Sequence, residues 1–150
     1  MQQALDLAAQ AMRITSPNPR VGCVIVNAQG QVIGQGHTQR AGGHHAEIMA
    51  LQDAAHQGHS VEGATAYVTL EPCAMCMGAM MHARLARVVF GAHDPKTGVC
   101  GSVLDLPSHE QLNHHTEVQG GVLSEACGNV LRQFFKKRRM KDAVNEKTST

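Results

Sequence analysis

The chain has 150 residues, of which 43% are hydrophobic and 17% are charged, and its formal net charge is +1. This length suits one domain with a hydrophobic core and is too short for two ordinary domains, while the small net charge neither favours nor excludes a nucleic-acid partner. No apolar run approaches the ~18 residues that a membrane-spanning helix requires, and the N-terminus lacks the basic start and apolar core of a signal peptide. We therefore expect a cytoplasmic protein without membrane segments, whose five cysteines are metal ligands or buried thiols rather than disulfides.

Apolar side chains recur with a helical period over residues 2–13, and Pro17 and Pro19 end this first helix. Short apolar runs rich in β-branched residues predict a hairpin of strands at 21–26 and 31–36. The remaining elements are expected in the order helix 45–55, strand 64–70, helix 73–83, strand 86–91, partly helical segment 103–112, strand 117–118 and helix 122–139. Strands that alternate with helices indicate a layered α/β fold. A domain of residues 1–140 is expected to be followed by a polar, disordered tail of residues 141–150.

One histidine and two cysteines have the spacing of a metal site. Cys73 and Cys76 are separated by two residues, so both sulfurs can reach one ion from the first turn of a helix, where the helix dipole favours thiolates. His45 lies 28 positions before Cys73, far enough for a helix and a strand to bring it back to the same point. Three protein ligands leave the fourth tetrahedral position of a zinc ion open for water, which is typical of catalytic zinc sites.

A carboxylate two residues after the histidine completes this pattern. The order His-x-Glu followed by Pro-Cys-x-x-Cys is the signature of zinc nucleobase deaminases. Glu47 is therefore expected to be the general acid and base, which takes a proton from the activated water and delivers it to the ring nitrogen and then to the leaving amine. The alternative, a solvated carboxylate at a helix start, is the weaker interpretation beside His45. His44 would point elsewhere on a helix, and Cys23 and Cys127 fall on buried faces, so these three are not expected to be ligands.

A basic cluster stands near the C-terminus, formed by Lys136, Lys137, Arg138 and Arg139. Such a run is often a solvated helix end that complements the helix dipole. In a chain that also carries a nucleobase-deaminase signature, contact with RNA phosphates becomes the stronger interpretation.

From residue 64 to residue 139 the sequence resembles the bacterial tRNA adenosine deaminases. The motifs that carry this resemblance are residues 67–76, 78–84, 87–92, 94–98, 101–102, 113–115, 121–123 and 134–135. The resemblance covers about half of the chain. It implies a three-layer α/β/α, cytidine deaminase-like fold with a central mixed five-stranded sheet flanked by helices, one Zn²⁺ ion per subunit, and a homodimer in which the methionine-rich helix after Cys73 is part of the interface.

The first third of the chain has a second resemblance, to the pyrimidine deaminases of the riboflavin pathway. Residues 17–26, 39–43 and 63–73 carry it, and the loop before His45 is short, as in that family. That family usually has a longer insert between its zinc cysteines and is typically fused to a reductase domain, neither of which this sequence shows. Both differences favour the tRNA-type interpretation.

The two resemblances imply different contacts with the substrate. At the position of Thr38 the tRNA family usually has an asparagine that contacts the purine, and the riboflavin family has a histidine, so threonine matches neither. Asn18 either supplies an amide instead, as in the riboflavin family, or is only a turn residue between two prolines. The full set of expected substrate contacts is Asn18, Thr38, Ala46, Pro72, Asp94 and Lys96, with Asp94 near a ribose hydroxyl, and the basic cluster is expected to contact the RNA backbone.

The expected function is hydrolytic deamination of adenosine to inosine at the wobble position of a tRNA anticodon, with the anticodon stem-loop as partner. One alternative is deamination of a free nucleobase, a nucleoside or a riboflavin-pathway pyrimidine. A second alternative, from another class, is a non-catalytic RNA-binding subunit that retains zinc; the presence of Glu47 argues against it.

Overall fold

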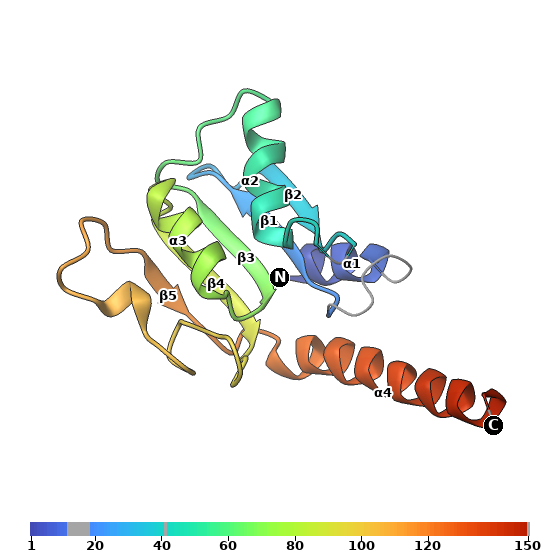
Figure 1. Ribbon diagram of the computed structural model, residues 1–150. Helices are drawn as coiled ribbons and strands as arrows, with labels where there is room; N and C mark the ends of the chain where they lie inside the picture. The colour runs from blue at the N-terminus through green and yellow to red at the C-terminus, as the bar shows by residue number, and fades with distance from the viewer. Residues whose placement is uncertain (12–18, 41, 150) are drawn as a thin grey trace.

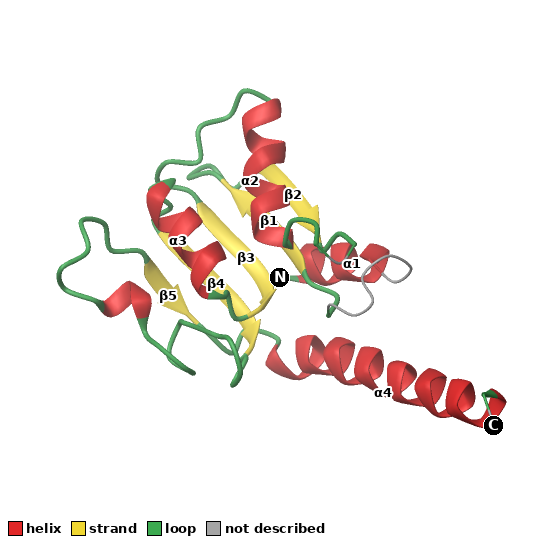
Figure 2. Ribbon diagram, viewed as in Figure 1, coloured by secondary structure: helices red, strands yellow, loops and turns green. Residues whose placement is uncertain are grey.

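The computed structural model describes residues 1–11, 19–40 and 42–149, and in it a central sheet lies between helices (Figures 1 and 2). The strands are β1 (Gly22–Val26), β2 (Val32–His37), β3 (Thr65–Leu70), β4 (Arg87–Ala92) and β5 (Glu117–Gln119). The helices are α1 (Gln2–Gln10), α2 (Ala46–His56), α3 (Ala74–His82) and α4 (Ser124–Thr148), with a short 3₁₀ turn at Leu106–Ser108. Among the described residues, no helix is both long and apolar enough to cross a membrane.

The sheet has the strand order β2-β1-β3-β4-β5 and is mixed. β1 pairs antiparallel with β2 and with β3, whereas the β3–β4 and β4–β5 pairs are parallel. The expected five-stranded mixed sheet is therefore confirmed. Because β3 and β4 are parallel and Leu70 pairs with Ala92, the segments that follow the two strands leave the sheet at the same edge.

Alternating side chains of the strands pack against helices on both faces. On one face, Cys23 and Ile25 of β1 are buried with Ala50 of α2 and Met77 of α3. On the other face, the intervening Val24 packs against α1. There α4 lies against β4, where a Cβ on Gly91 would come within 2.3 Å of the Cys127 sulfur. The result is the three-layer arrangement, with α2 and α3 on one side of the sheet and α1 and α4 on the other.

Helix α2 lies unusually close to β2 because glycines of that strand face it. A Cβ on Gly36 would lie 2.7 Å from the Ala50 backbone nitrogen and 2.8 Å from the Ala46 carbonyl oxygen, and one on Gly34 would lie 2.4 Å from the Ala50 carbonyl oxygen. The helix backbone thus rests directly on the strand. The contact reaches the first residue of α2, Ala46, which follows His45 directly.

Most predicted elements are present, with shifted ends. The first helix ends at Gln10, and residues 12–13 of its expected range lie outside the described residues. The segment 103–112, expected to be partly helical, contains only the 3₁₀ turn at Leu106–Ser108.

The end of the chain is more ordered than its polarity suggested. The expectation of a disordered tail after residue 140 is wrong for residues 141–148, because α4 continues to Thr148. This part of the helix has no glycine or proline to stop it, although it leads away from the sheet (Figure 1) and its apolar residues Met140 and Val144 are 62% and 60% exposed. A largely polar sequence is compatible both with an exposed helix and with a disordered tail. Composition alone therefore does not distinguish these two states.

The glycine contact between β2 and α2 yields a prediction for stability. The substitution Gly36→Ala should lower the free energy of unfolding by about 1–3 kcal/mol, because the added methyl group meets helix backbone that cannot move without displacing α2. Chemical denaturation measures this difference.

The matched control is Gly128→Ala in α4, where the nearest atom to the added methyl group is the flexible end of Arg132 at 3.2 Å. In a helix interior alanine is favoured over glycine by roughly 0.5–1 kcal/mol, so this variant should be as stable as the wild type or more so. Equal destabilisation of both variants would contradict the role assigned to Gly36.

Candidate metal centre and active site

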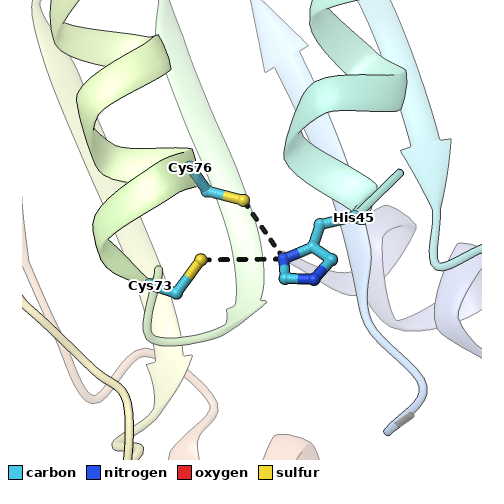
Figure 3. Close-up of side chains that lie close together, drawn as sticks. All are labelled: His45, Cys73 and Cys76. Carbon is cyan, nitrogen blue, oxygen red and sulfur yellow. Dashed lines mark hydrogen bonds between the residues drawn. The ribbon is translucent and has the colours of Figure 1, made fainter. Parts of the chain in front are cut away.

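Two helix starts bring one imidazole and two thiols together at one edge of the sheet. His45 is the N-cap of α2 and Cys73 the N-cap of α3, and neither side chain makes a capping hydrogen bond, so both are available to the site. Cys76 lies in the first turn of α3 and is fully buried. Figure 3 shows the three side chains pointing toward one another, with the His45 Nδ1 atom 3.6 Å from the Cys73 sulfur and 3.3 Å from the Cys76 sulfur.

The separation of these donor atoms fits zinc. The three ligand atoms lie within 4.8 Å of one another. Tetrahedral zinc with Zn–S bonds of ~2.3 Å and Zn–N bonds of ~2.0–2.1 Å places a nitrogen and a sulfur ligand about 3.5 Å apart. The observed distances of 3.3 and 3.6 Å bracket that value. One nitrogen and two sulfurs are also the donor types that zinc prefers.

Electrostatics at the helix starts favour an ionised thiol. A hydrogen bond from the Cys76 thiol is the largest influence on Cys73 and lowers its pKa to about 5. The pKa of Cys76 is raised well above its ordinary value, first because its thiol donates that hydrogen bond and second because it is buried. The pair therefore loses its first proton readily and gives a thiolate ligand near neutral pH.

Glu47 lies in the first turn of α2, one turn or less from the histidine, and is only 4% exposed. Burial raises the pKa of its carboxyl to about 7, and Cys73 adds to this rise while Cys76 and His45 oppose it. A carboxyl group that ionises near neutral pH can both accept and return a proton during one reaction cycle.

A cavity of about 150 Å³ opens beside the metal-binding residues. It is smaller than the roughly 300 Å³ at which pockets for drug-sized ligands begin. The residues that line it come from the end of β3, the first turn of α2 and the segments next to the strands and helices at this edge: Pro19, Val21, Thr38, His45, Glu47, Leu70, Glu71, Cys73, Asp94 and Thr97. The structure thus places Thr38 and Asp94, two of the expected substrate contacts, around the same cavity as His45, Glu47 and Cys73.

The hydroxyl of Thr38 is already used by the backbone. Its Oγ1 atom accepts a hydrogen bond from the Val21 N–H at 3.0 Å and donates one to the Val21 carbonyl at 3.4 Å. Thr38 is buried, and its hydroxyl has both a donor and an acceptor in the Val21 backbone without any substrate. A contact of Thr38 with the substrate stays a prediction.

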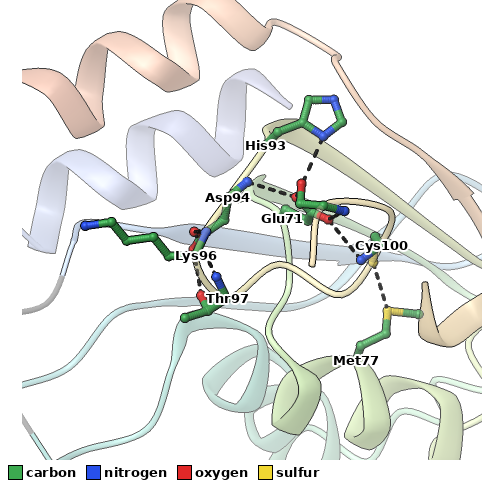
Figure 4. A network of polar contacts seen from close by, with 8 residues as sticks. Glu71, Met77, His93, Asp94, Lys96, Thr97 and Cys100 are labelled. Atoms are coloured by element: carbon green, nitrogen blue, oxygen red, sulfur yellow. Dashed lines mark hydrogen bonds and ion pairs between the residues drawn. The ribbon is translucent and has the colours of Figure 1, made fainter. Parts of the chain in front are cut away.

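Asp94 shapes the turn in which it stands. Its carboxylate accepts hydrogen bonds from the backbone N–H groups of Lys96 and Thr97 and from the Thr97 hydroxyl (Figure 4). Lys96 is exposed and does not line the cavity. Ala46 and Pro72 are buried next to the metal-binding residues but also lie outside the cavity lining, and Asn18 lies outside the described residues.

Glu71 also lines the cavity, although it is not among the site residues expected from the sequence. It is 2% exposed. Burial alone would raise its pKa, but hydrogen bonds from the Ser102 hydroxyl and from the backbone N–H groups of Asp94, Ser102 and Cys100 outweigh burial and hold the pKa below its ordinary value. The sequence signal for this role was the position of Glu71, a charged residue between an apolar strand and an apolar helix. A carboxylate that is buried at such a position requires hydrogen-bond partners.

A groove of about 750 Å³ runs along the basic part of α4. It is lined by Lys96, Arg132, Phe135, Lys136, Arg138, Arg139 and Asp142. A smaller depression lined by Pro19, Leu70, His93, Asp94, Pro95, Lys96, Thr97, Leu131 and Phe135 shares residues with this groove and with the cavity. The cavity and the basic surface are therefore continuous, and of the predicted basic cluster only Lys137 does not line the groove.

Comparison with known proteins assigns the chain to a family. The family model for the cytidine and deoxycytidylate deaminase zinc-binding region matches residues 1–92. The chain is 41% identical to the tRNA-specific adenosine deaminase of Haemophilus influenzae over 97% of this chain and 87% of that protein.

Two solved structures have the same fold. A structure from a study of A-to-I editing by tRNA:A34 deaminases at the wobble position of transfer RNA has a TM-score of 0.77 and 34% identity, over 87% of this chain and 97% of that one. RibD from Acinetobacter baumannii has a TM-score of 0.75 and 38% identity over 90% of this chain, but the match spans 37% of that longer chain. Both resemblances expected from the sequence are thus present.

The fold, the metal-binding geometry and these relatives agree. Zinc is the cofactor, with one site for it among the described residues of the chain. The chain belongs to the cytidine deaminase-like zinc enzymes and, within them, to the tRNA-specific adenosine deaminase family.

Proposed function

We propose that this protein hydrolyses the C6 amino group of adenosine at the wobble position of a tRNA anticodon and leaves inosine. The observation that carries this proposal is the placement of Glu47 beside the metal-binding residues in a small cavity that continues into a basic groove. A small cavity admits a single base, and the basic groove suits the phosphates on either side of that base. The relatives named tRNA-specific adenosine deaminase and tRNA:A34 deaminase support the same substrate.

The chemistry is divided between the metal and one carboxylate. His45, Cys73 and Cys76 would hold the zinc, which as a Lewis acid would lower the pKa of a water molecule toward neutral pH. Glu47 takes one proton of the attacking water and delivers it to N1 of the adenine ring, and it then takes the second proton from the added oxygen and transfers it to the amino group as the C6–N bond breaks. A new C6–O bond replaces the C6–N bond, and ammonia leaves.

The cavity selects the base mainly by its shape. Val21 and Leu70 contribute apolar walls, and the Thr38 hydroxyl is occupied by the Val21 backbone. An adenine in an anticodon loop is already partly unstacked, so moving it into such a cavity costs less than flipping a base out of a duplex. Lys96 and the three residues of the basic cluster that line the groove, Lys136, Arg138 and Arg139, then contact the RNA backbone, and the reaction takes place in the cytoplasm.

We also propose that two copies associate through the surface around α3. This helix is rich in methionine, and a shallow, partly apolar groove beside it is lined by Gly78, Met81, His82, Arg84, Leu106, Leu112, Asn113 and His114. The neighbouring residues Val103 and Leu104 are 51% and 59% exposed. An apolar surface of this kind is typical of a region that another protein covers.

The dimer proposal predicts that Leu112→Glu, which places a charge in this groove, shifts the protein to a monomer in sedimentation velocity. The control is Val144→Glu on the outer part of α4, which is 60% exposed and lies outside the groove. A wild-type protein that is monomeric at all concentrations tested would contradict the dimer.

The role of Glu47 predicts that Glu47→Gln lowers the rate of inosine formation in an anticodon stem-loop RNA by at least about a hundredfold, the lower end of the usual contribution of general acid–base catalysis. Zinc content should remain one ion per chain, since the carboxylate is not a ligand. Chromatography of the digested RNA measures inosine, and elemental analysis measures zinc.

Three further variants complete this experiment. Cys76→Ala should lose both zinc and activity, whereas Cys127→Ala, which removes another buried thiol outside the metal cluster, should keep both. Glu62→Gln changes an exposed carboxylate and should have no effect.

Turnover of a free nucleobase, nucleoside or riboflavin-pathway pyrimidine, with no ammonia released from RNA, would overturn the proposed substrate. RNA binding without any turnover would indicate the non-catalytic subunit.

The basic groove predicts that Lys136→Gln weakens binding of the stem-loop RNA and reduces the slope of log K against log salt concentration by about 0.7–1. Lys137→Gln is the matched control, because its side chain belongs to the same helix turn but does not line the groove. Binding titrations at several salt concentrations measure both slopes. Equal changes in the two variants would show that the charge of the helix, rather than the groove, attracts RNA.

A further inference from the structure

Glu71 connects the metal-binding part of the chain to a loop that comes later in the sequence. It follows the last residue of β3 and precedes Pro72 and Cys73. The loop, residues 93–102, follows β4, the parallel neighbour of β3. The loop therefore leaves the sheet at the same edge as Glu71 does.

Both oxygens of the Glu71 carboxylate accept hydrogen bonds from this loop (Figure 4). Oε1 accepts from the backbone N–H groups of Cys100 at 2.9 Å and Ser102 at 3.1 Å. Oε2 accepts from the Asp94 N–H at 2.8 Å and from the Ser102 hydroxyl. One buried side chain thus holds the loop at both its beginning and its end.

The loop packs tightly against the carboxylate between these two points. A Cβ on Gly98 would lie 2.3 Å from the Glu71 Cδ atom, so only glycine fits there. The backbone adds two further links, from the Val99 N–H to the Pro72 carbonyl at 3.0 Å and from the Glu71 N–H to the Ala92 carbonyl at 2.8 Å. The loop is therefore seated on the segment that leads into the metal-binding helix.

This loop supplies one wall of the cavity. Asp94 and Thr97 line the cavity, and Lys96 lines the basic groove that continues from it. Asp94 and Thr97 also bond to each other within the turn, so the turn behaves as one unit that is attached to the body of the protein at the Asp94 N–H.

We propose that Glu71 is a positioning residue for substrate binding: it fixes the loop of residues 93–102 so that Asp94, Lys96 and Thr97 form the wall against which the target nucleotide lies. Glu71 acts through the loop, while His45, Glu47, Cys73 and Cys76 perform the reaction. The inference rests on the proposed function, because it assigns the loop to the RNA substrate.

The test is Glu71→Gln, which keeps the shape of the side chain but places an N–H group opposite either the Asp94 N–H or the N–H groups of Cys100 and Ser102. Since an amide cannot accept on both sides, at least one attachment is lost. The expected result is a rise of about tenfold to a hundredfold in KM for the stem-loop RNA, with kcat within about threefold of the wild type and zinc at one ion per chain.

Hydrogen exchange gives a measurement that does not depend on activity. In Glu71→Gln, the backbone amides of Asp94, Cys100 and Ser102 should exchange at least about tenfold faster. The matched control is Asp53→Asn, because Asp53 also accepts a backbone hydrogen bond, from the Gln35 N–H at 2.9 Å, but on the other side of the molecule. This control should speed exchange at Gln35 and leave the loop and KM unchanged.

Ser102→Ala serves as a second variant if Glu71→Gln does not fold, since it removes one donor and leaves three backbone donors on the carboxylate. A KM increase of about two- to fivefold is expected. Loss of zinc with a fall in kcat in Glu71→Gln, or unchanged KM and unchanged exchange in the loop, would overturn the positioning role. If the wild type does not deaminate RNA, the proposed function fails, whereas the exchange experiment still decides whether Glu71 holds the loop.

Discussion

The site depends on the meeting of two helix N-termini at one edge of the sheet. α2 must begin at His45 and α3 at Cys73, and the donor atoms tolerate little error, because nitrogen and sulfur ligands of one zinc ion lie within a narrow range of distances. The sheet sets this geometry through close contacts. Gly34 and Gly36 let α2 rest on β2 without side chains between them, so the position of the histidine follows from backbone packing rather than from flexible side chains.

The helix starts also explain why the metal centre could be predicted from sequence. Each ligand is determined locally: Cys73 and Cys76 by their spacing within one turn, and His45 by its place before a helix with Glu47 in its first turn. The strands could also be predicted from the sequence. Short apolar runs that are rich in β-branched residues and bounded by glycine and polar turns are typical of strands. For these elements, the local sequence and the tertiary packing favour the same secondary structure.

Other features depended on partners far along the chain and could not be found in this way. The donors to Glu71 lie 23 to 31 residues later, and nothing near position 71 shows that they fold back to it. The occupied hydroxyl of Thr38 depends on Val21, which is 17 residues away. The length of α4 was missed for the opposite reason: it has few tertiary contacts, and a polar sequence without glycine or proline fits both a helix and a disordered tail.

The cavity and the basic groove are built from different parts of the chain. Every residue that lines the cavity lies between Pro19 and Thr97, and α4 contributes none of them. The groove is lined almost entirely by α4, with Lys96 as the link. Substitutions on the exposed part of the last helix would therefore change the charge of the groove while leaving the metal-binding residues and the cavity in place.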